Sequence, residues 1–97
     1  MKSLRWSAQK NAEMLAARGV SFEQMVIAIE AGGLIDVLAH PNITRYPNQK
    51  VLVVANEGYA YLVPFVEQAD HYFLKTLIPS RKATRDYLKQ GAPYAQS

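Results

Sequence analysis

The spacing of apolar residues changes twice along the chain. Between residues 7 and 31 apolar residues recur three and four positions apart, a period typical of amphipathic helices. From residue 34 to residue 78 they alternate with polar residues or form short apolar runs, which indicates strands. Helical spacing returns after Pro79. Two helices, a strand-rich middle and a final helix together predict an α+β fold in which the helices pack on a small sheet.

Local signals predict where the first two helices begin and end. Ser7 can cap a helix that runs to Arg18, and Gly19 is the usual left-handed stop. Ser21 and Gln24 form a capping box, a pair of reciprocal side-chain to backbone hydrogen bonds at a helix start. A second helix is therefore expected to begin there and to end at the next two glycines. Its apolar stripe should face the core and consists of Phe22, Met25, Val26 and Ile29.

The strand-rich middle is expected to form a mostly antiparallel sheet of three to four strands. Residues 56–58 indicate a hairpin turn, and Pro64, which has no amide hydrogen, marks an edge position or a bulge. The whole chain, 1–97, is expected to be one domain with a loosely held tail over 91–97. Strands are predicted over residues 34–39, 50–55, 59–66 and 71–78.

Composition excludes several kinds of chemistry. The absence of cysteine rules out disulfides, thiolate metal sites and cysteine nucleophiles. His40 and His71 lack the spacing of a metal site or a catalytic triad, so we expect no metal and no cofactor. No apolar run approaches the length of about 18 residues that a membrane span needs, which predicts a cytoplasmic protein without membrane contact. The formal net charge of +3 suits a polyanionic partner.

The final helix is strongly basic. Ser80 can cap it, and only Asp86 balances its basic residues, which are Arg81, Lys82, Arg85 and Lys89. Like charges four positions apart destabilise an isolated helix by roughly 0.2–0.5 kcal/mol per pair. Arg81 and Lys82 stand in the first turn, where free amides and basic side chains can together hold a phosphate. Residue chemistry alone favours the alternative, a solvated basic face. The buried face should consist of Ala83, Thr84, Tyr87 and Leu88.

Two stretches resemble the BrnT-type toxins. The segment LRWSAQKNAEMLAARGVSFEQM resembles the opening of that family, and KTLIPSRKATRDYL is similar to its closing strand, turn and helix. The resemblance implies a RelE-like fold and the toxin of a type II toxin-antitoxin pair, acting as a metal-independent endoribonuclease that inhibits growth. It also implies a cognate DNA-binding antitoxin that joins the toxin in a hetero-oligomer, with operator DNA bound only through the antitoxin.

The resemblance also assigns the candidate site residues. By position, the family motif falls on Trp6, Lys10, Asn11, Arg18, Gly19, Phe22, Arg81, Lys82 and Tyr87. This chain departs from the family at Ser7, where an acid is usual, and at Arg18, where a histidine is usual. The missing histidine removes the most obvious general acid or base.

Metal-independent cleavage needs a base for the ribose 2′-hydroxyl, cations for the phosphorane and an acid for the leaving oxygen. Arg81 is the candidate cation because its planar fork matches phosphate oxygens. Lys82 or Lys10 would orient substrate or exchange protons, and Tyr87 is the candidate acid. The catalytic set is therefore Arg81, Lys82 and Tyr87, and the RNA-binding set is Lys10, Arg18, Lys75 and Arg85.

Lys10 and Arg18 lie within about 80° of each other around their helix and are expected to share a groove with the last helix. Tyr59 and Tyr61 share one face of a strand, where tyrosine can stack on a base but more often packs. Two further readings remain open. One is a toxin-fold protein that has lost the nuclease and binds only an antitoxin or nucleic acid, and the other is a small α+β domain with an incidental basic face.

Overall fold

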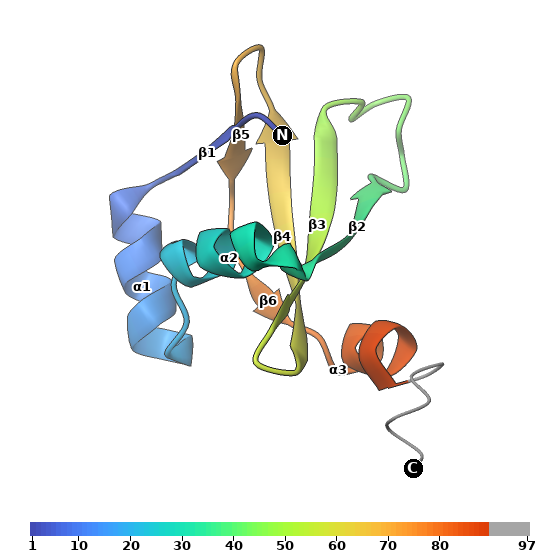
Figure 1. Ribbon diagram of the computed structural model, residues 1–97. Coiled ribbons are helices and arrows are strands. Elements are labelled where there is room, and N and C mark those ends of the chain that lie inside the picture. Colours follow the sequence, from blue (N-terminus) through green and yellow to red (C-terminus); the bar gives the residue numbers. More distant parts are fainter. Residues whose placement is uncertain (90–97) are drawn as a thin grey trace.

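A six-stranded sheet with helices on both faces makes up residues 1–89, the part of the chain that the computed structural model describes (Figure 1). The predicted α+β class is confirmed, and the predicted tail over 91–97 lies outside the described residues. The elements are β1 (Ser3–Trp6), α1 (Ala8–Arg18), α2 (Phe22–Ala28), η1 (Ile29–Gly33), β2 (Leu34–Ala39), β3 (Gln49–Asn56), β4 (Tyr59–Glu67), β5 (His71–Leu74), β6 (Ile78–Pro79), α3 (Arg81–Ala83) and η2 (Thr84–Lys89).

The N-terminal helices begin where the capping residues predict. The Ser7 hydroxyl accepts a hydrogen bond from the Lys10 amide at 3.2 Å, and Gly19 ends α1 with a φ of 71°. Ser21 and Gln24 make both bonds of the capping box, at 3.3 and 2.9 Å. Beyond α2 the chain widens into the π-helical turn η1, which reaches Gly32 and Gly33, the two glycines predicted to end the helix.

The strand order is β1-β5-β4-β3-β2, with β6 also paired to β4. The predicted hairpin between β3 and β4 is confirmed, because Glu57 and Gly58 both have positive φ, as a type I′ turn requires. β1 pairs in parallel with β5, so the sheet has more strands than the three to four predicted. The Glu67 carboxylate, 2.9 Å from the ammonium groups of both Lys2 and Lys50, ties the start of the chain to β3 and β4.

The predicted continuous strand over 71–78 is wrong, because the chain breaks into β5 and β6. Both pieces pair with β4, but their registers differ by one residue. The break lies opposite Pro64, whose carbonyl accepts from the Lys75 amide at 2.8 Å. In an antiparallel strand the amide and the carbonyl of one residue point to the same neighbouring strand. Pro64 has no amide hydrogen, so β4 offers no donor to the neighbouring strand at this position, and the pairing breaks here. The edge position or bulge predicted for Pro64 is therefore wrong: β4 is a central strand in unbroken register with β3, and the irregularity falls in the neighbouring strand.

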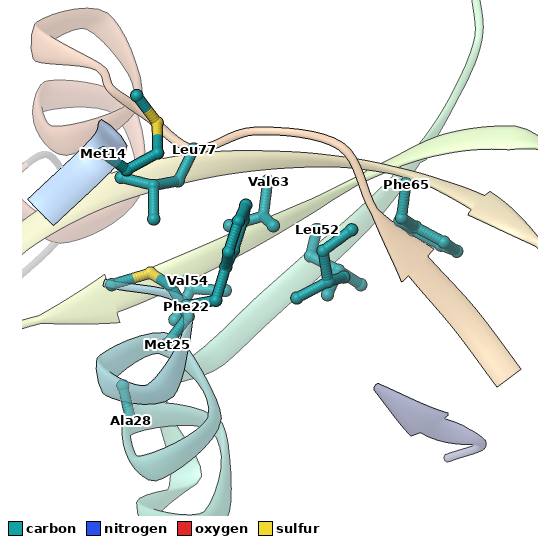
Figure 2. Packing of buried hydrophobic residues seen from close by; sticks show 10 residues of the cluster. Met14, Phe22, Met25, Ala28, Leu52, Val54, Val63, Phe65 and Leu77 are labelled. Carbon is teal, nitrogen blue, oxygen red and sulfur yellow. The ribbon is translucent and has the colours of Figure 1, made fainter. Parts of the chain in front are cut away.

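Each face of the sheet carries its own core. On the first face α2 inserts Phe22 and Met25 toward Leu52 and Val54 of β3, as Figure 2 shows. Val53 lies between those two β3 residues and therefore points to the opposite face. There it packs with Ala60 and Ala83, together with Ile35, Leu62 and Leu88. The last helix therefore covers the second face, opposite α2.

Candidate nucleic-acid interface

A buried threonine attaches the last helix to the sheet. The Thr84 hydroxyl accepts a hydrogen bond from the Ala60 amide at 2.8 Å and donates one to the Ser80 carbonyl at 2.7 Å. The Ser80 amide donates to the Ala60 carbonyl at 2.9 Å, and the Ser80 hydroxyl caps the helix by accepting from the Ala83 amide at 3.0 Å. The predicted cap is confirmed. Because Ala60 follows the β3–β4 hairpin, these bonds hold the helix start beside Tyr59.

Arg81 and Arg85 line one depression next to that hairpin. Tyr59 and Thr84 complete its lining, and its volume is about 430 Å³. The Arg85 guanidinium is 3.2 Å from Asp86 and is partly neutralised, whereas no carboxylate of residues 1–89 lies within 4.0 Å of Arg81. Two guanidinium groups and an aromatic side chain therefore meet on one open surface. This combination suits the phosphates and bases of a single-stranded nucleic acid.

Lys82 and Tyr87 line a second depression of about 230 Å³, together with Leu38, Leu62, Ser80, Ala83 and Asp86. The Tyr87 hydroxyl donates to Asp36 at 2.9 Å, and the other Asp36 oxygen accepts from the Val37 amide at 2.8 Å. Asp36 reaches Tyr87 because the β2–β3 register shifts between Leu34 and Asp36, the effect of a β-bulge.

The environment of Tyr87 holds its proton in place. Its hydrogen bond to Asp36 raises the pKa of Tyr87 above the ordinary value near 10, and burial and the charges of Asp36 and Asp86 act in the same direction. A phenol with a raised pKa stays protonated at neutral pH, and here its proton points at a carboxylate. Tyr87, the predicted acid, therefore already donates its hydroxyl proton in a hydrogen bond to Asp36.

The predicted position of Tyr87 on the buried face is wrong. Ala83 and Thr84 are buried as expected, but Tyr87 is 37% exposed. The reason is the π-helical turn η2, which is wider than an α-helical turn and therefore rotates the residues after Thr84. The same helix therefore separates the predicted catalytic residues. Arg81 lies in one depression, and Lys82 and Tyr87 lie in the other.

The shared groove expected between the first and last helices is not formed. Lys10 and Arg18 belong to α1, whose Met14 packs in the core of the first face, whereas the last helix covers the second face. Figure 1 shows α1 and α3 on opposite sides of the view. Lys75 lies at the break between β5 and β6, with its ammonium 5.5 Å from the centroid of the Phe73 ring. The next residue, Thr76, donates a hydrogen bond to Met14 Sδ of α1 at 3.3 Å, so this part of the chain adjoins α1.

Asp36 is the site residue that sequence reasoning missed. Its role depends on a β-bulge in β2, and the segment LIDVLA carries no glycine or other local signal for one. Within residues 1–89, no three His, Asp or Glu side chains form a group that could hold a metal ion. Over the same range, no helix is long and apolar enough to cross a membrane.

Comparison with known proteins gives no match for this chain, whether to family models, to curated proteins or to solved structures.

Proposed function

We propose that this chain is the toxin of a type II toxin-antitoxin pair, with a RelE-like fold, and that it cleaves RNA in the cytoplasm without a metal. The observation that carries this proposal is the convergence of Arg81, Arg85 and Tyr59 on one depression. A basic face that only contacts solvent does not require the Tyr59 side chain beside the arginines, or the buried Thr84 hydroxyl that fixes the helix to the sheet. Both features support a site that positions a phosphate.

In this proposal the reacting phosphate lies between the two depressions, where it can contact both Arg81 and the next residue, Lys82. The guanidinium of Arg81 then neutralises the phosphorane that forms when the ribose 2′-oxygen attacks the phosphorus. The ammonium of Lys82 supplies the proton that the leaving 5′-oxygen needs. Tyr87, predicted as the acid, acts here with Asp36 as the base: it receives the proton of the 2′-hydroxyl while it passes its own proton to Asp36 over their 2.9 Å hydrogen bond. The Arg85 guanidinium holds a neighbouring phosphate beside the hairpin.

The partner in this proposal is an acidic, DNA-binding antitoxin that covers the same basic surface in a hetero-oligomer. Arg81 has no carboxylate partner among residues 1–89, and acidic side chains of the antitoxin would supply one. Antitoxin and RNA would then compete for one site, which accounts for inhibition.

Induced expression in a bacterial host tests the proposal, with growth and RNA 5′ ends followed together. The native chain should arrest growth and create new 5′ ends. Arg81→Ala should lower the cleavage rate about 100-fold or more at equal protein level, as removal of a donor to a charged intermediate does. Arg5→Ala is the matched control, because Arg5 is an exposed arginine of β1, at the edge of the sheet. New ends that persist in Arg81→Ala would refute the assignment.

A second function, binding without cleavage, is favoured by one observation. The Tyr87 proton is committed to Asp36, and the usual histidine of the family is replaced by Arg18. A binding protein would retain RNA affinity that depends on Arg81 and Arg85 yet produce no new RNA ends. The expression experiment separates the two functions, because only the nuclease changes the RNA 5′ ends.

A further inference from the structure

The last helix covers only part of the second face of the sheet. It packs over Val53 and Ala60, near the β3–β4 hairpin. Further along the strands, two cross-strand rows on the same face lie beyond this core. The first row is Leu38, Val51 and Pro64, and the second is His40, Gln49, Val66 and Phe73.

A cavity of about 200 Å³ lies over these rows. Its walls are mostly apolar, and its polar side chains are His40, Gln49 and Lys75; Lys50 also lines it, but its side chain points to the first face of the sheet. Lys50 is bound to Glu67 at 2.9 Å, but Lys75 has no carboxylate within 4.0 Å among residues 1–89. One cation is therefore available at an apolar cavity.

The rim of the cavity is fixed before any ligand arrives. The His40 amide donates to the Gln49 carbonyl at 3.1 Å, and the Asn42 amide donates to His40 Nδ1 at 2.9 Å. Because Nδ1 accepts, the neutral ring carries its proton on Nε2 and can donate there. The Tyr46 ring lies 4.6 Å from the imidazole at an angle of 43°, and the Arg45 guanidinium lies over Tyr46. The imidazole orientation is therefore set by both contacts.

We propose that this cavity binds one nucleotide, with the base against the apolar floor and the phosphate on Lys75. Pro41 and Pro64 offer flat apolar walls to a heterocycle, and His40 Nε2 and the side-chain amide of Gln49 can form hydrogen bonds with the edge of the base. A purely aliphatic ligand would leave these polar groups without partners. The exposed Lys75 ammonium, held over the Phe73 ring, provides the charge that the phosphate requires.

The cavity adjoins the depression that holds Lys82 and Tyr87. Leu38 lines that depression and His40 lines the cavity, and two residues along a strand span about 7 Å on one face. Leu62 and Pro64 make the same step on β4. This part of the inference rests on the proposed function: RNA cut beside Lys82 would place the next nucleotide of the strand in the cavity.

A titration of isotope-labelled protein with adenosine 5′-monophosphate and with uridine 5′-monophosphate, followed by NMR, tests the inference. The backbone amides of Gln49, Val66 and Lys75 should shift. Lys75→Met keeps the side-chain stem over Phe73 and removes the charge, and it should weaken binding by about threefold to fivefold. Val66→Phe fills the cavity and should abolish the shifts. Ala12→Glu, which lowers the net charge by one at an exposed position of α1 on the other face of the sheet, should leave affinity unchanged.

Two outcomes would overturn the inference. One is shifts confined to the Arg81–Arg85 region, and the other is unchanged affinity in both Lys75→Met and Val66→Phe with well-dispersed spectra. The RNA cleavage assay is independent of this titration. Cleavage without nucleotide shifts in the cavity would refute the inference alone, whereas nucleotide binding without cleavage would refute the proposed nuclease and leave the cavity assignment standing.

Discussion

Thr84→Val replaces the hydroxyl of a side chain that is 3% exposed by a methyl group and keeps the shape of that side chain. That hydroxyl accepts from the Ala60 amide and donates to the Ser80 carbonyl, at 2.8 and 2.7 Å. The Ser80 carbonyl keeps a second donor, the Thr84 amide at 3.0 Å, and so remains satisfied. The Ala60 amide loses the acceptor supplied by Thr84 and is left buried without one.

A buried amide that loses its acceptor costs about 1–3 kcal/mol. We therefore expect Thr84→Val to lower the free energy of unfolding by about 2 kcal/mol, within a range set by how far water can reach the amide. In a domain of this size such a loss corresponds to a fall in Tm of about 8–16 °C. Urea denaturation followed by circular dichroism measures the first quantity, and thermal denaturation measures the second.

Two further variants separate the hydroxyl from the methyl group. Thr84→Ser restores the hydroxyl and should recover most of the loss. Thr44→Val makes the same chemical change at an exposed position in the loop after β2 and should leave stability within about 0.5 kcal/mol of the native chain. A Thr84→Val variant as stable as Thr44→Val would refute the claim that this hydroxyl fixes the last helix to the sheet.

Three other changes have defined outcomes. Hydrogen bonds from two lysines, and then their charges, lower the pKa of Glu67 in the folded protein. The ionised carboxylate therefore stabilises the fold above its unfolded pKa, and this stabilisation is lost as pH falls through the lower folded pKa. Glu67→Gln should lower the free energy of unfolding at pH 7 but not in acid, which urea denaturation at several pH values measures. A Cβ at Gly33 would lie 2.5 Å from a backbone carbonyl oxygen of β3, so Gly33→Ala should lower Tm far more than Gly32→Ala, where the Cβ meets nothing within 4 Å and only the positive φ is strained. Asp36→Asn removes the negative charge beside Tyr87, so one tyrosine should titrate at lower pH in the ultraviolet spectrum, and an unchanged titration would contradict the contact.

The predictions that succeeded depend on neighbours in the chain. The hydroxyls of Ser7, Ser21 and Ser80 each bond an amide three residues ahead, so the helix starts follow from a few adjacent residues. The hairpin at Glu57 and Gly58 is equally local. The spacing of four on one helix also explains why Arg81 and Arg85 line one depression, although the sequence predicts that Arg81 acts with Lys82 and Tyr87.

The predictions that failed depend on contacts between distant parts of the chain. β1 pairs with β5, which lies far from it in the sequence, and a strand of four residues is too short for its hydrophobic pattern to predict that pairing. The groove expected between Lys10 and the last helix required knowing which face each helix covers. Tyr87 left the predicted buried face because η2 is wider than an α-helix, and its partner Asp36 is turned toward it by a β-bulge.

The most direct measurement of the central claim, that the last helix binds RNA phosphates, is the salt dependence of RNA affinity. Fluorescence anisotropy with a short single-stranded RNA gives the dissociation constant at several salt concentrations for the native chain, Arg81→Ala and Arg5→Ala. Each phosphate contact with single-stranded RNA contributes about 0.7 to the slope of log affinity against log salt. We predict that Arg81→Ala reduces the slope by about 0.7 and that Arg5→Ala leaves it unchanged. Equal slopes for all three proteins would contradict the claim.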